Sequence, residues 1–335
     1  MSIVMTGGGT GGHLTIIKAV KEHLVGENLI YIGSKKGQDQ AWFANDKQFQ
    51  STHFLDTQGV VNQGILGKFK SVFMLLKATI QARKTLKDSK AKIVFCVGGF
   101  SAAPTSFAAL TLRIPLVIHE QNAAIGSLNK LLRSKAKAFI SSYEEQSPIR
   151  AYPIKNEYFE KSRIRENIQT IMFLGGSQGA KAINELALEL APTLKEKNIK
   201  IIHQAGERNI SEVEKAYEAL GIQAEVFGFS TKISDYMEEA DFAIARSGAS
   251  TLWELSAMAC PALYIPYPYA AADHQFHNAK FLVDQDVAWI MREKELNVEK
   301  VIELLDENMH EKSIKLQSMI ERDGALKIAQ LLKSI

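Results

Sequence analysis

The chain has 335 residues, of which 46% are hydrophobic and 23% charged. This composition is typical of a folded soluble protein with about two domains, and it excludes a disordered chain, a collagen-like fibre and a small disulfide-rich protein. The net charge of +3 conceals an asymmetry: residues 1–150 hold 19 basic and 9 acidic residues, whereas residues 151–335 hold 21 and 28. We therefore expect the basic half to bind an anionic partner.

The two cysteines, Cys96 and Cys260, lie in apolar, strand-like segments, which favours buried thiols in a reducing compartment over a disulfide. No apolar run reaches the ~18 residues that a membrane-spanning helix needs. The chain begins in a strand-like segment without a signal peptide, so we expect a cytoplasmic protein whose membrane contact is peripheral.

Short apolar or β-branched runs alternate with helix-period segments along the whole chain, a pattern that predicts parallel sheets covered by helices. The strands predicted in the first half are Ile3–Thr6, Leu29–Gly33, His53–Leu55, Ile93–Gly98, Pro115–His119 and Ala138–Ser142. Those predicted in the second half are Thr170–Gly175, Lys200–Gln204, Ala224–Phe229, Phe242–Ala245, Ala262–Pro266 and Val287–Met291. Two prolines, Pro148 and Pro153, place the domain boundary near residue 150, giving domains 1–150 and 151–335. From about Glu311 the chain is predicted to be helical.

A glycine-rich loop, Gly7-Gly8-Gly9-Thr10-Gly11-Gly12-His13, follows the first strand and precedes a helical run. Such a loop lets backbone N–H groups approach an anion, which the positive end of the helix also attracts. The glycines match the dinucleotide-binding spacing G-x-G-x-x-G, but that fingerprint requires an acidic residue after the second strand. Here that strand ends in Ser34-Lys35-Lys36, so a dinucleotide site is disfavoured.

Two further glycine-rich loops, Gly98–Pro104 and Gly175–Lys181, also follow strands. The third loop lacks the spacing of a P-loop, which disfavours nucleoside triphosphate hydrolysis. A tight turn would explain any one loop, but three of them at the carboxyl ends of parallel strands indicate a ligand-binding edge.

Three polar segments have open interpretations. His119-Glu120-Gln121-Asn122 ends an apolar strand and forms either a functional site or a structural network. In the segment Arg246–Glu254, Ser250 or Thr251 is expected to cap a helix, and Glu254 either completes that cap or accepts two ribose hydroxyls. Asp284-Gln285-Asp286 resembles a metal-binding D-x-D but falls in a predicted turn, so we predict no metal.

These motifs, together with Asp273-His274-Gln275 and Asn278-Ala279, occur in the order seen in the MurG family of the GT-B superfamily, which the chain resembles over nearly its whole length. The resemblance implies an α/β GT-B fold of two Rossmann-like parallel-sheet domains facing across a cleft. The N-terminal domain would bind the acceptor and the membrane, and the C-terminal domain would bind UDP-N-acetylglucosamine (UDP-GlcNAc). The final helix, about residues 311–335, would pack back on the N-terminal domain.

The activity implied by the resemblance is inverting transfer of GlcNAc from UDP-GlcNAc to the C4 hydroxyl of the muramyl sugar of lipid I. The product, lipid II, serves peptidoglycan and cell-wall synthesis, and the enzyme would work as a peripheral protein on the cytoplasmic face of the inner membrane. No cofactor and no nucleic acid are expected. The alternatives are a GT-B transferase with another acceptor, a UDP-GlcNAc 2-epimerase, or a non-catalytic nucleotide-sugar sensor. The oligomeric state stays open.

The resemblance also assigns roles to residues. His13 is the expected general base, since an imidazole pKa of about 6.5 suits proton transfer at neutral pH, and Glu120 is the second candidate. The donor is expected to contact Thr10, Gly11, Gly12, Asn122, Lys155, Ser177, Ser230, Ala249, Ser250, Thr251, Glu254 and Gln275. The acceptor pyrophosphate is expected at Gly8, Gly9, Gly98 and Gly99. Lys155 stands where the family usually has an arginine, so a bidentate contact there is lost.

The basic excess of the first half is concentrated in residues 61–95, which carry eight basic residues and one acidic residue. Apolar residues alternate with the lysines, and no nucleic-acid motif accompanies them. We predict a basic amphipathic face, with Lys68, Phe69, Lys70 and Phe73 at an anionic membrane surface. The alternative is an ordinary core helix with a solvated basic face.

Overall fold

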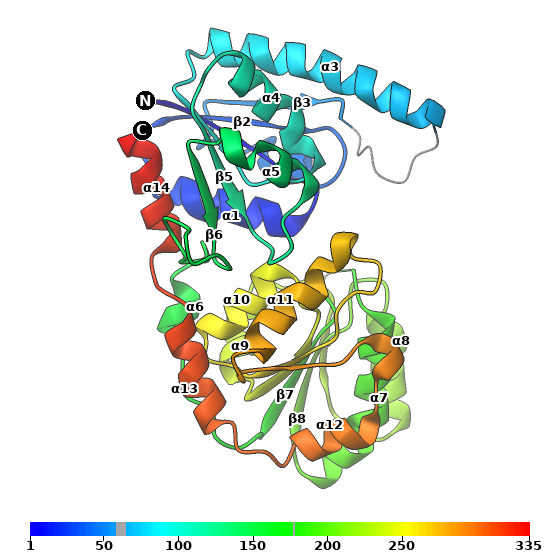
Figure 1. The fold of residues 1–335 in the computed structure, drawn as a ribbon. Helices are drawn as coiled ribbons and strands as arrows, with labels where there is room; N and C mark the ends of the chain where they lie inside the picture. The colour runs from blue at the N-terminus through cyan, green and yellow to red at the C-terminus, as the bar shows by residue number, and fades with distance from the viewer. Residues whose placement is uncertain (58–64, 177) are drawn as a thin grey trace. The chain divides into compact units, whose positions relative to one another are not determined.

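The computed structural model describes residues 1–57, 65–176 and 178–335, and the side chains of these except in 65–70. The described chain forms two compact units (Figure 1). Unit 1 comprises Met1–Ile154 together with Asp323–Ile335, and unit 2 comprises Lys155–Arg322. The division falls just after the two linker prolines.

Unit 1 is built on a six-stranded parallel sheet of order β3-β2-β1-β4-β5-β6. Its strands are β1 (Ser2–Thr6), β2 (Asn28–Ser34), β3 (Ser51–Leu55), β4 (Ile93–Cys96), β5 (Leu116–Glu120) and β6 (Ala138–Ser141). Its helices are α1 (Gly11–Glu22), α2 (Asp39–Phe43), α3 (Ile65–Asp88), α4 (Ala103–Thr111), α5 (Ser127–Leu132) and α14 (Gly324–Ser334), with short 3₁₀ turns η1 (Phe100–Ala102) and η2 (Arg133–Lys135). The six strands predicted in the first half are confirmed, with ends that differ by at most two residues.

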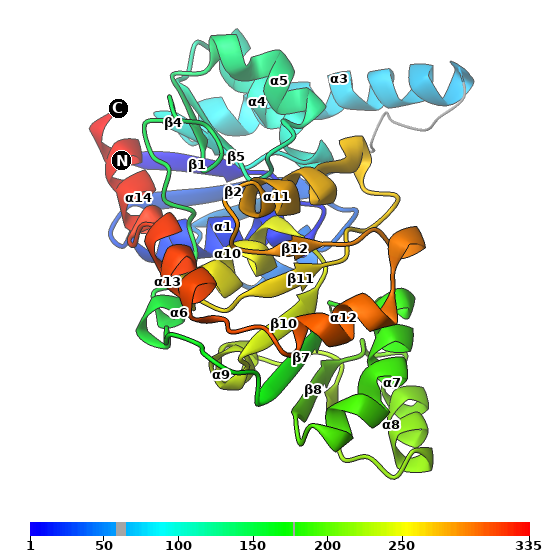
Figure 2. The same ribbon diagram turned by 60° about the horizontal axis from the view of Figure 1, so that its bottom comes forward.

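Unit 2 repeats the plan with a parallel sheet of order β12-β11-β10-β7-β8-β9, of which β12, β11, β10, β7 and β8 are labelled in Figure 2. Its strands are β7 (Thr170–Leu174), β8 (Lys200–Gln204), β9 (Glu225–Phe227), β10 (Phe242–Ala245), β11 (Ala262–Tyr264) and β12 (Trp289–Ile290). Its helices are α6 (Glu157–Glu160), α7 (Lys181–Glu196), α8 (Ile210–Ala219), α9 (Ile233–Glu239), α10 (Ala249–Ala257), α11 (His274–Val283), α12 (Val298–Leu304) and α13 (His310–Met319), with 3₁₀ turns η3 (Ala271–Asp273) and η4 (Glu293–Glu295). The strands predicted in the second half are confirmed as well.

The C-terminal segment forms two helices where the sequence predicted one. The chain leaves the helical conformation at Ile320, and Asp323 adopts a left-handed φ of 64° before α14 begins. A Cβ on Gly324 would lie 2.6 Å from the carbonyl oxygens of Ala151 and Tyr152, so this close approach requires glycine. As a result α13 belongs to unit 2, whereas α14 packs against α1 in unit 1.

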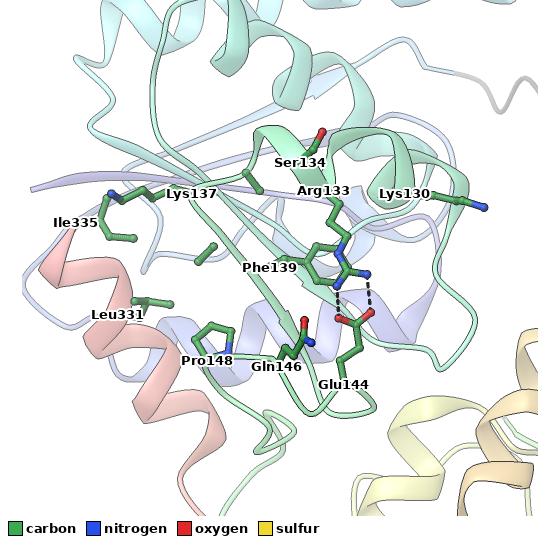
Figure 3. A pocket seen from close by; sticks show the side chains of 12 residues that line it. Lys130, Arg133, Ser134, Lys137, Phe139, Glu144, Gln146, Pro148, Leu331 and Ile335 are labelled. Atoms are coloured by element: carbon green, nitrogen blue, oxygen red, sulfur yellow. Dashed lines mark hydrogen bonds and ion pairs between the residues drawn. The ribbon is translucent and has the colours of Figure 1, made fainter.

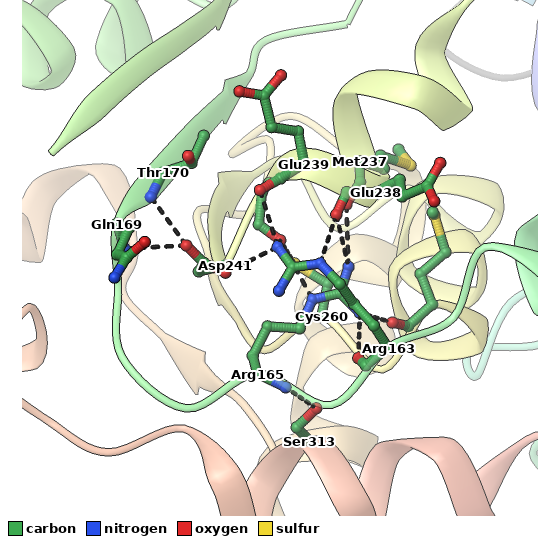
Figure 4. A network of polar contacts seen from close by, with 12 residues as sticks. Arg163, Arg165, Gln169, Thr170, Met237, Glu238, Glu239, Asp241, Cys260 and Ser313 are labelled. Atoms are coloured by element: carbon green, nitrogen blue, oxygen red, sulfur yellow. Dashed lines mark hydrogen bonds and ion pairs between the residues drawn. The ribbon is translucent and has the colours of Figure 1, made fainter.

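A buried arginine, Arg165, connects the C-terminal ends of two helices in unit 2 (Figure 4). Arg165 is fully buried, and its guanidinium donates to the carbonyls of Ala240, Met258 and Met237, among others. These carbonyls lie at the C-terminal ends of α9 and α10, where helices leave acceptors unsatisfied. The charge is thus dispersed over backbone dipoles deep in the protein.

Cys96 and Cys260 are free and buried, as predicted. Burial raises the pKa of both thiols, so they stay protonated and inert at neutral pH.

Candidate functional site

The first glycine loop connects β1 to α1 and holds its amides in two different ways. The Gly8 amide donates to the Gly98 carbonyl at 3.3 Å, and the Gly9 amide donates to Asp39 Oδ1 at 2.5 Å. Thr10 is the N-cap of α1 and makes no side-chain capping bond, so the first turn of the helix, Gly11–His13, has no side-chain cap. The N–H groups with which this loop could bind an anion are therefore those of this turn, rather than those of Gly8 and Gly9.

Asp39 was missed by the sequence interpretation, which found no acidic residue following the second strand. It is fully buried and accepts from the backbone amides of Gly9 and Ser34. An acidic residue does therefore follow β2, but its carboxylate binds the protein's own backbone. This carboxylate is therefore not available to bind a ribose, which is the role of the acidic residue in the dinucleotide fingerprint.

His13, the predicted base, lies in the first turn of α1 between two polar side chains. Its Nδ1 is 2.9 Å from Thr10 Oγ1, and the Gln121 amide nitrogen is 3.1 Å from its Nε2. Both contacts are satisfied when the proton is on Nδ1 and Nε2 accepts. The Nε2 lone pair is the one that a base would use, and in this arrangement the Gln121 amide occupies it, so a substrate hydroxyl must replace that contact before His13 can act as a base.

Glu120, the second candidate base, ends β5 and is almost completely buried. One carboxylate oxygen accepts from the Asn122 amide at 2.9 Å, and the other accepts from the Gly126 amide and Asn129 Nδ2, both at 2.9 Å. Because these donors come from the protein, the carboxylate braces the loop that carries Gln121 and Asn122. The contacts favour a positioning role over proton transfer.

Several buried polar atoms beside these loops have no hydrogen-bond partner among the described residues. Burial, and then the nearby His13, lowers the pKa of His119 to about 3, so its ring is neutral, and neither ring nitrogen is paired. The hydroxyls of Ser101 and Thr105, near the Gly98–Gly99 loop, also have no partner among the described residues. Such atoms are unusual in a protein interior and concentrate at sites that act on ligands or water.

The third glycine loop joins β7 to α7 in unit 2. The Gly175 amide donates to the Gln204 carbonyl at 3.2 Å, and the Gly176 amide donates to Gln204 Oε1 at 3.1 Å. Ala180 caps α7 without a side-chain bond, which leaves the first-turn amides without a side-chain cap. Ser177, predicted at the donor phosphates, lies outside the described residues.

Glu254 lies half-buried on α10, behind the strand β10. The helix begins at Ala249 with Gly248 as its N-cap, so the expectation that Ser250 or Thr251 caps it was wrong: both lie inside the first turn. Glu254 is therefore not part of a capping box. Burial raises the pKa of its carboxyl to about 7, an effect that Lys155 and the Tyr158 hydroxyl partly oppose.

Two other predicted donor contacts in unit 2, Ser230 and Gln275, make hydrogen bonds to the backbone. Ser230 Oγ accepts from the Lys232 amide, and Gln275 Oε1 accepts from the Tyr267 amide. Asn278, fully buried, donates to the carbonyl of Ser247 just before α10. Lys155 forms an exposed ion pair with Glu157 at 3.2 Å. These bonds give the loops around α10 and α11 fixed shapes.

Both acids of Asp284-Gln285-Asp286 are paired with lysines. Lys280 contacts Asp284 at 2.6 Å, and Lys312 contacts Asp286 at 2.6 Å. Within the part of the chain that the structure describes, no group of three or more His, Cys, Asp or Glu side chains has the arrangement of a metal site.

The described part of α3 exposes apolar side chains over two turns. Phe73 is 70% exposed, Ile80 69% and Leu76 58%, whereas Ala78, Ala82 and Leu86 enter the core on the other side. Lys77, Lys84 and Lys87 are exposed on the same helix. The core-helix alternative explains only the inner side of α3. The side chains of Lys68, Phe69 and Lys70 lie outside the described residues.

A cavity of about 740 Å³ lies elsewhere in unit 1, between η2, β6 and α14 (Figure 3). Arg133 makes a bidentate ion pair with Glu144 at its edge and stacks over Phe139. None of the predicted site residues lines this cavity.

The fold is shared with a solved glycosyltransferase. The crystal structure of Acinetobacter baumannii MurG matches with a TM-score of 0.80 and 28% identity, covering 100% of this chain and 99% of that one. Two parallel six-stranded sheets, each with a glycine loop before a helix without a side-chain cap, give this chain a two-domain α/β fold of the GT-B type, as in that glycosyltransferase.

The sequence comparisons are more specific. Residues 3–141 match the glycosyltransferase family 28 N-terminal domain, and residues 170–334 match the family 28 C-terminal domain. A curated Sulfurovum protein named UDP-N-acetylglucosamine--N-acetylmuramyl-(pentapeptide) pyrophosphoryl-undecaprenol N-acetylglucosamine transferase is 66% identical over 334 residues, covering 100% of this chain and 99% of its own. A Wolinella succinogenes protein of the same name is 49% identical, with 100% of both chains covered. The chain belongs to glycosyltransferase family 28.

Proposed function

We propose that this protein transfers GlcNAc from UDP-GlcNAc to the C4 hydroxyl of the muramyl sugar of lipid I, forming lipid II. The observation that carries the proposal is the 66% identity, over the full length of both chains, to a curated relative with that name. The residues that such a reaction needs, His13, Glu120, Asn122 and Glu254, are all present.

The donor binds unit 2. Glu254 accepts the two ribose hydroxyls, because an ionised carboxylate offers two oxygens and accepts without donating. The uncapped first turn of α7 and the Gly175–Gly179 segment receive the diphosphate, with Ser177 beside it. Ser230, Ala249, Ser250, Thr251 and Gln275 shape the remaining contacts, and Lys155 contributes charge.

The acceptor binds unit 1, with its pyrophosphate at the loops of Gly8–Gly9 and Gly98–Gly99. Since the amides of Gly8 and Gly9 already donate within the protein, the first turn of α1 supplies the N–H groups that face the anion. This places the acceptor beside His13.

The chemical step is a single inverting displacement. The muramyl C4 hydroxyl takes the place of the Gln121 amide at His13 Nε2, and this nitrogen accepts the hydroxyl proton as the oxygen bonds to the anomeric carbon and the bond from that carbon to the diphosphate breaks. The electron pair leaves with UDP, whose charge is met by the amides at the start of α7. None of these steps requires a metal.

The enzyme docks on an anionic membrane through α3. Phe73, Leu76 and Ile80 provide apolar area, and the lysines around them attract acidic headgroups at about 1 kcal/mol each. None of the described helices is long and apolar enough to span a bilayer. We place the protein at the cytoplasmic face of the cell membrane, where its lipid-linked acceptor is anchored.

The test is an assay of UDP release by the purified protein with UDP-GlcNAc and a lipid I analogue. Release that depends on the acceptor is expected, and its absence overturns the proposal. The same assay separates the alternatives: a 2-epimerase converts UDP-GlcNAc without any acceptor, and a nucleotide-sugar sensor binds it without turnover.

A further inference from the structure

We infer that Asp39 is a positioning residue for the acceptor site: it sets the conformation in which the first glycine loop receives a pyrophosphate. The inference deepens the proposed function and rests on its placement of the acceptor in unit 1. The glycine motif has no position for this residue. The dinucleotide fingerprint expects an acid that binds a ribose, whereas the Asp39 carboxylate points back into the loop.

The carboxylate is positioned by the chain on both sides of it. Asp39 opens α2, is fully buried, and accepts from the Gly9 amide at 2.5 Å and the Ser34 amide at 2.8 Å. It therefore joins the end of β2 to the loop after β1, and its partner Gly9 lies 30 residues before it in the sequence. A carboxylate that accepts two backbone N–H groups is held firmly in place.

The loop has little freedom around this contact. A Cβ on Gly8 would overlap the Asp39 carboxylate, so only glycine fits there. Tyr31 donates its hydroxyl to the Gly7 carbonyl at 2.9 Å. Burial, and then the charge of Asp39, raises the pKa of Tyr31, so this hydroxyl stays protonated and continues to donate.

The hydrogen bond to Asp39 determines which backbone amides of the loop face a ligand. With the Gly9 N–H turned toward Asp39, the chain enters α1 at Thr10 with its first-turn N–H groups uncapped by any side chain. Without Asp39, the Gly9 amide is released and the loop can rotate, so the anion loses a preorganised set of donors. The buried negative charge acts through loop geometry, since it would itself repel a phosphate.

The decisive variant is Asp39→Asn. Asparagine has the same size but only one acceptor oxygen, so one of the two N–H groups faces an NH₂ group instead. We expect kcat/KM for the lipid I analogue to fall about 30-fold, with the KM for UDP-GlcNAc within about twofold of wild type. The matched control is Asp46→Asn, which removes a carboxylate of unit 1 that pairs with Lys21 away from the loop.

A purely structural role predicts a different result: the acceptor and donor parameters would fall together, in proportion to the folded fraction measured by circular dichroism. That result, or a folded Asp39→Asn with wild-type acceptor kinetics, overturns the inference. If Asp39→Asn does not fold, Tyr31→Phe, which loosens the same loop at Gly7, must lower kcat/KM for the acceptor selectively.

Binding of inorganic pyrophosphate, measured by calorimetry with UDP saturating unit 2, separates this inference from the proposed function. We expect wild type and Asp46→Asn to bind it equally and Asp39→Asn at least about tenfold more weakly. If this difference appears while wild type transfers no GlcNAc, the proposed function fails and the role of Asp39 stands. Equal binding by all three proteins overturns the role of Asp39.

Discussion

The carboxylates at the carboxyl ends of the two sheets have different partners. In unit 1, Asp39 and Glu120 are buried and accept from backbone amides, so they hold loops in place. In unit 2, Glu254 has a tyrosine hydroxyl and a lysine nearby, and burial raises the pKa of its carboxyl to about 7. Unit 1 thus uses its acids to hold loops in place, whereas the proposed function gives the acid of unit 2 to the ribose hydroxyl groups.

The proposed mechanism puts proton transfer in unit 1, with His13 and not Glu120 as the base. We expect His13→Ala to lower kcat about 10²- to 10⁴-fold, the usual contribution of a general base, with the Kd for UDP unchanged because UDP binds unit 2. Single-turnover kinetics and calorimetry measure the two quantities. His23→Ala, at the other end of α1, is the control. A His13→Ala enzyme that chiefly loses affinity for substrate would return the role of base to Glu120.

In unit 2 a buried cation, the Arg165 guanidinium, holds backbone carbonyls in place, whereas unit 1 uses carboxylates to hold backbone amides. Arg165→Met leaves at least three buried carbonyls without donors, so we expect unfolding free energy to fall by about 3 kcal/mol or more. Urea denaturation measures this. The control is Arg163→Met, a neighbouring arginine whose side chain is 40% exposed, where water replaces the lost bonds. Equal losses in the two variants would show that burial of the guanidinium is not the cause.

Because the Glu254 carboxylate is proposed to bind the ribose, we predict that the affinity for the donor depends on pH. Ribose hydroxyls prefer the ionised carboxylate, whose pKa in the empty site is about 7. Affinity for UDP-GlcNAc should therefore be greatest above pH 7 and weaken by up to about tenfold per unit below it. Calorimetry from pH 6 to 8 measures the trend, since the phosphodiester groups of this donor do not titrate there.

Glu254→Gln should bind UDP-GlcNAc about 10- to 100-fold more weakly at pH 8, with no pH dependence. Glu239→Gln, an exposed acid of unit 2 paired with Lys200, should keep the wild-type profile. A flat profile in the wild type would contradict the assignment of Glu254 to the ribose.

The strands and glycine loops were predictable because each is a continuous signal: a run of apolar or β-branched residues that ends in glycines. Asp39 was not, since its contact joins segments that no spacing rule connects. The helix cap at Gly248 was missed because serine and threonine are the stronger capping residues, and here the backbone of a glycine serves instead. The break before α14 had a local signal, Asp323-Gly324, which the helical periodicity on either side concealed.

The proposed function gives unit 1 a second anionic partner, the membrane at the exposed face of α3, and the smallest predicted effect concerns this face. Replacing Phe73 and Ile80 together by serine should weaken binding to vesicles with acidic phospholipids about tenfold or more, because both side chains would enter the interface. UDP affinity should not change. Leu131→Ser, which removes an equally exposed apolar side chain on α5, is the control in a sedimentation assay. If the control weakens binding as much as the double variant, or the double variant binds like wild type, the membrane face is not α3.

Lys84→Glu should weaken binding to acidic vesicles and leave binding to neutral ones unchanged, which separates the contribution of charge from that of the apolar side chains.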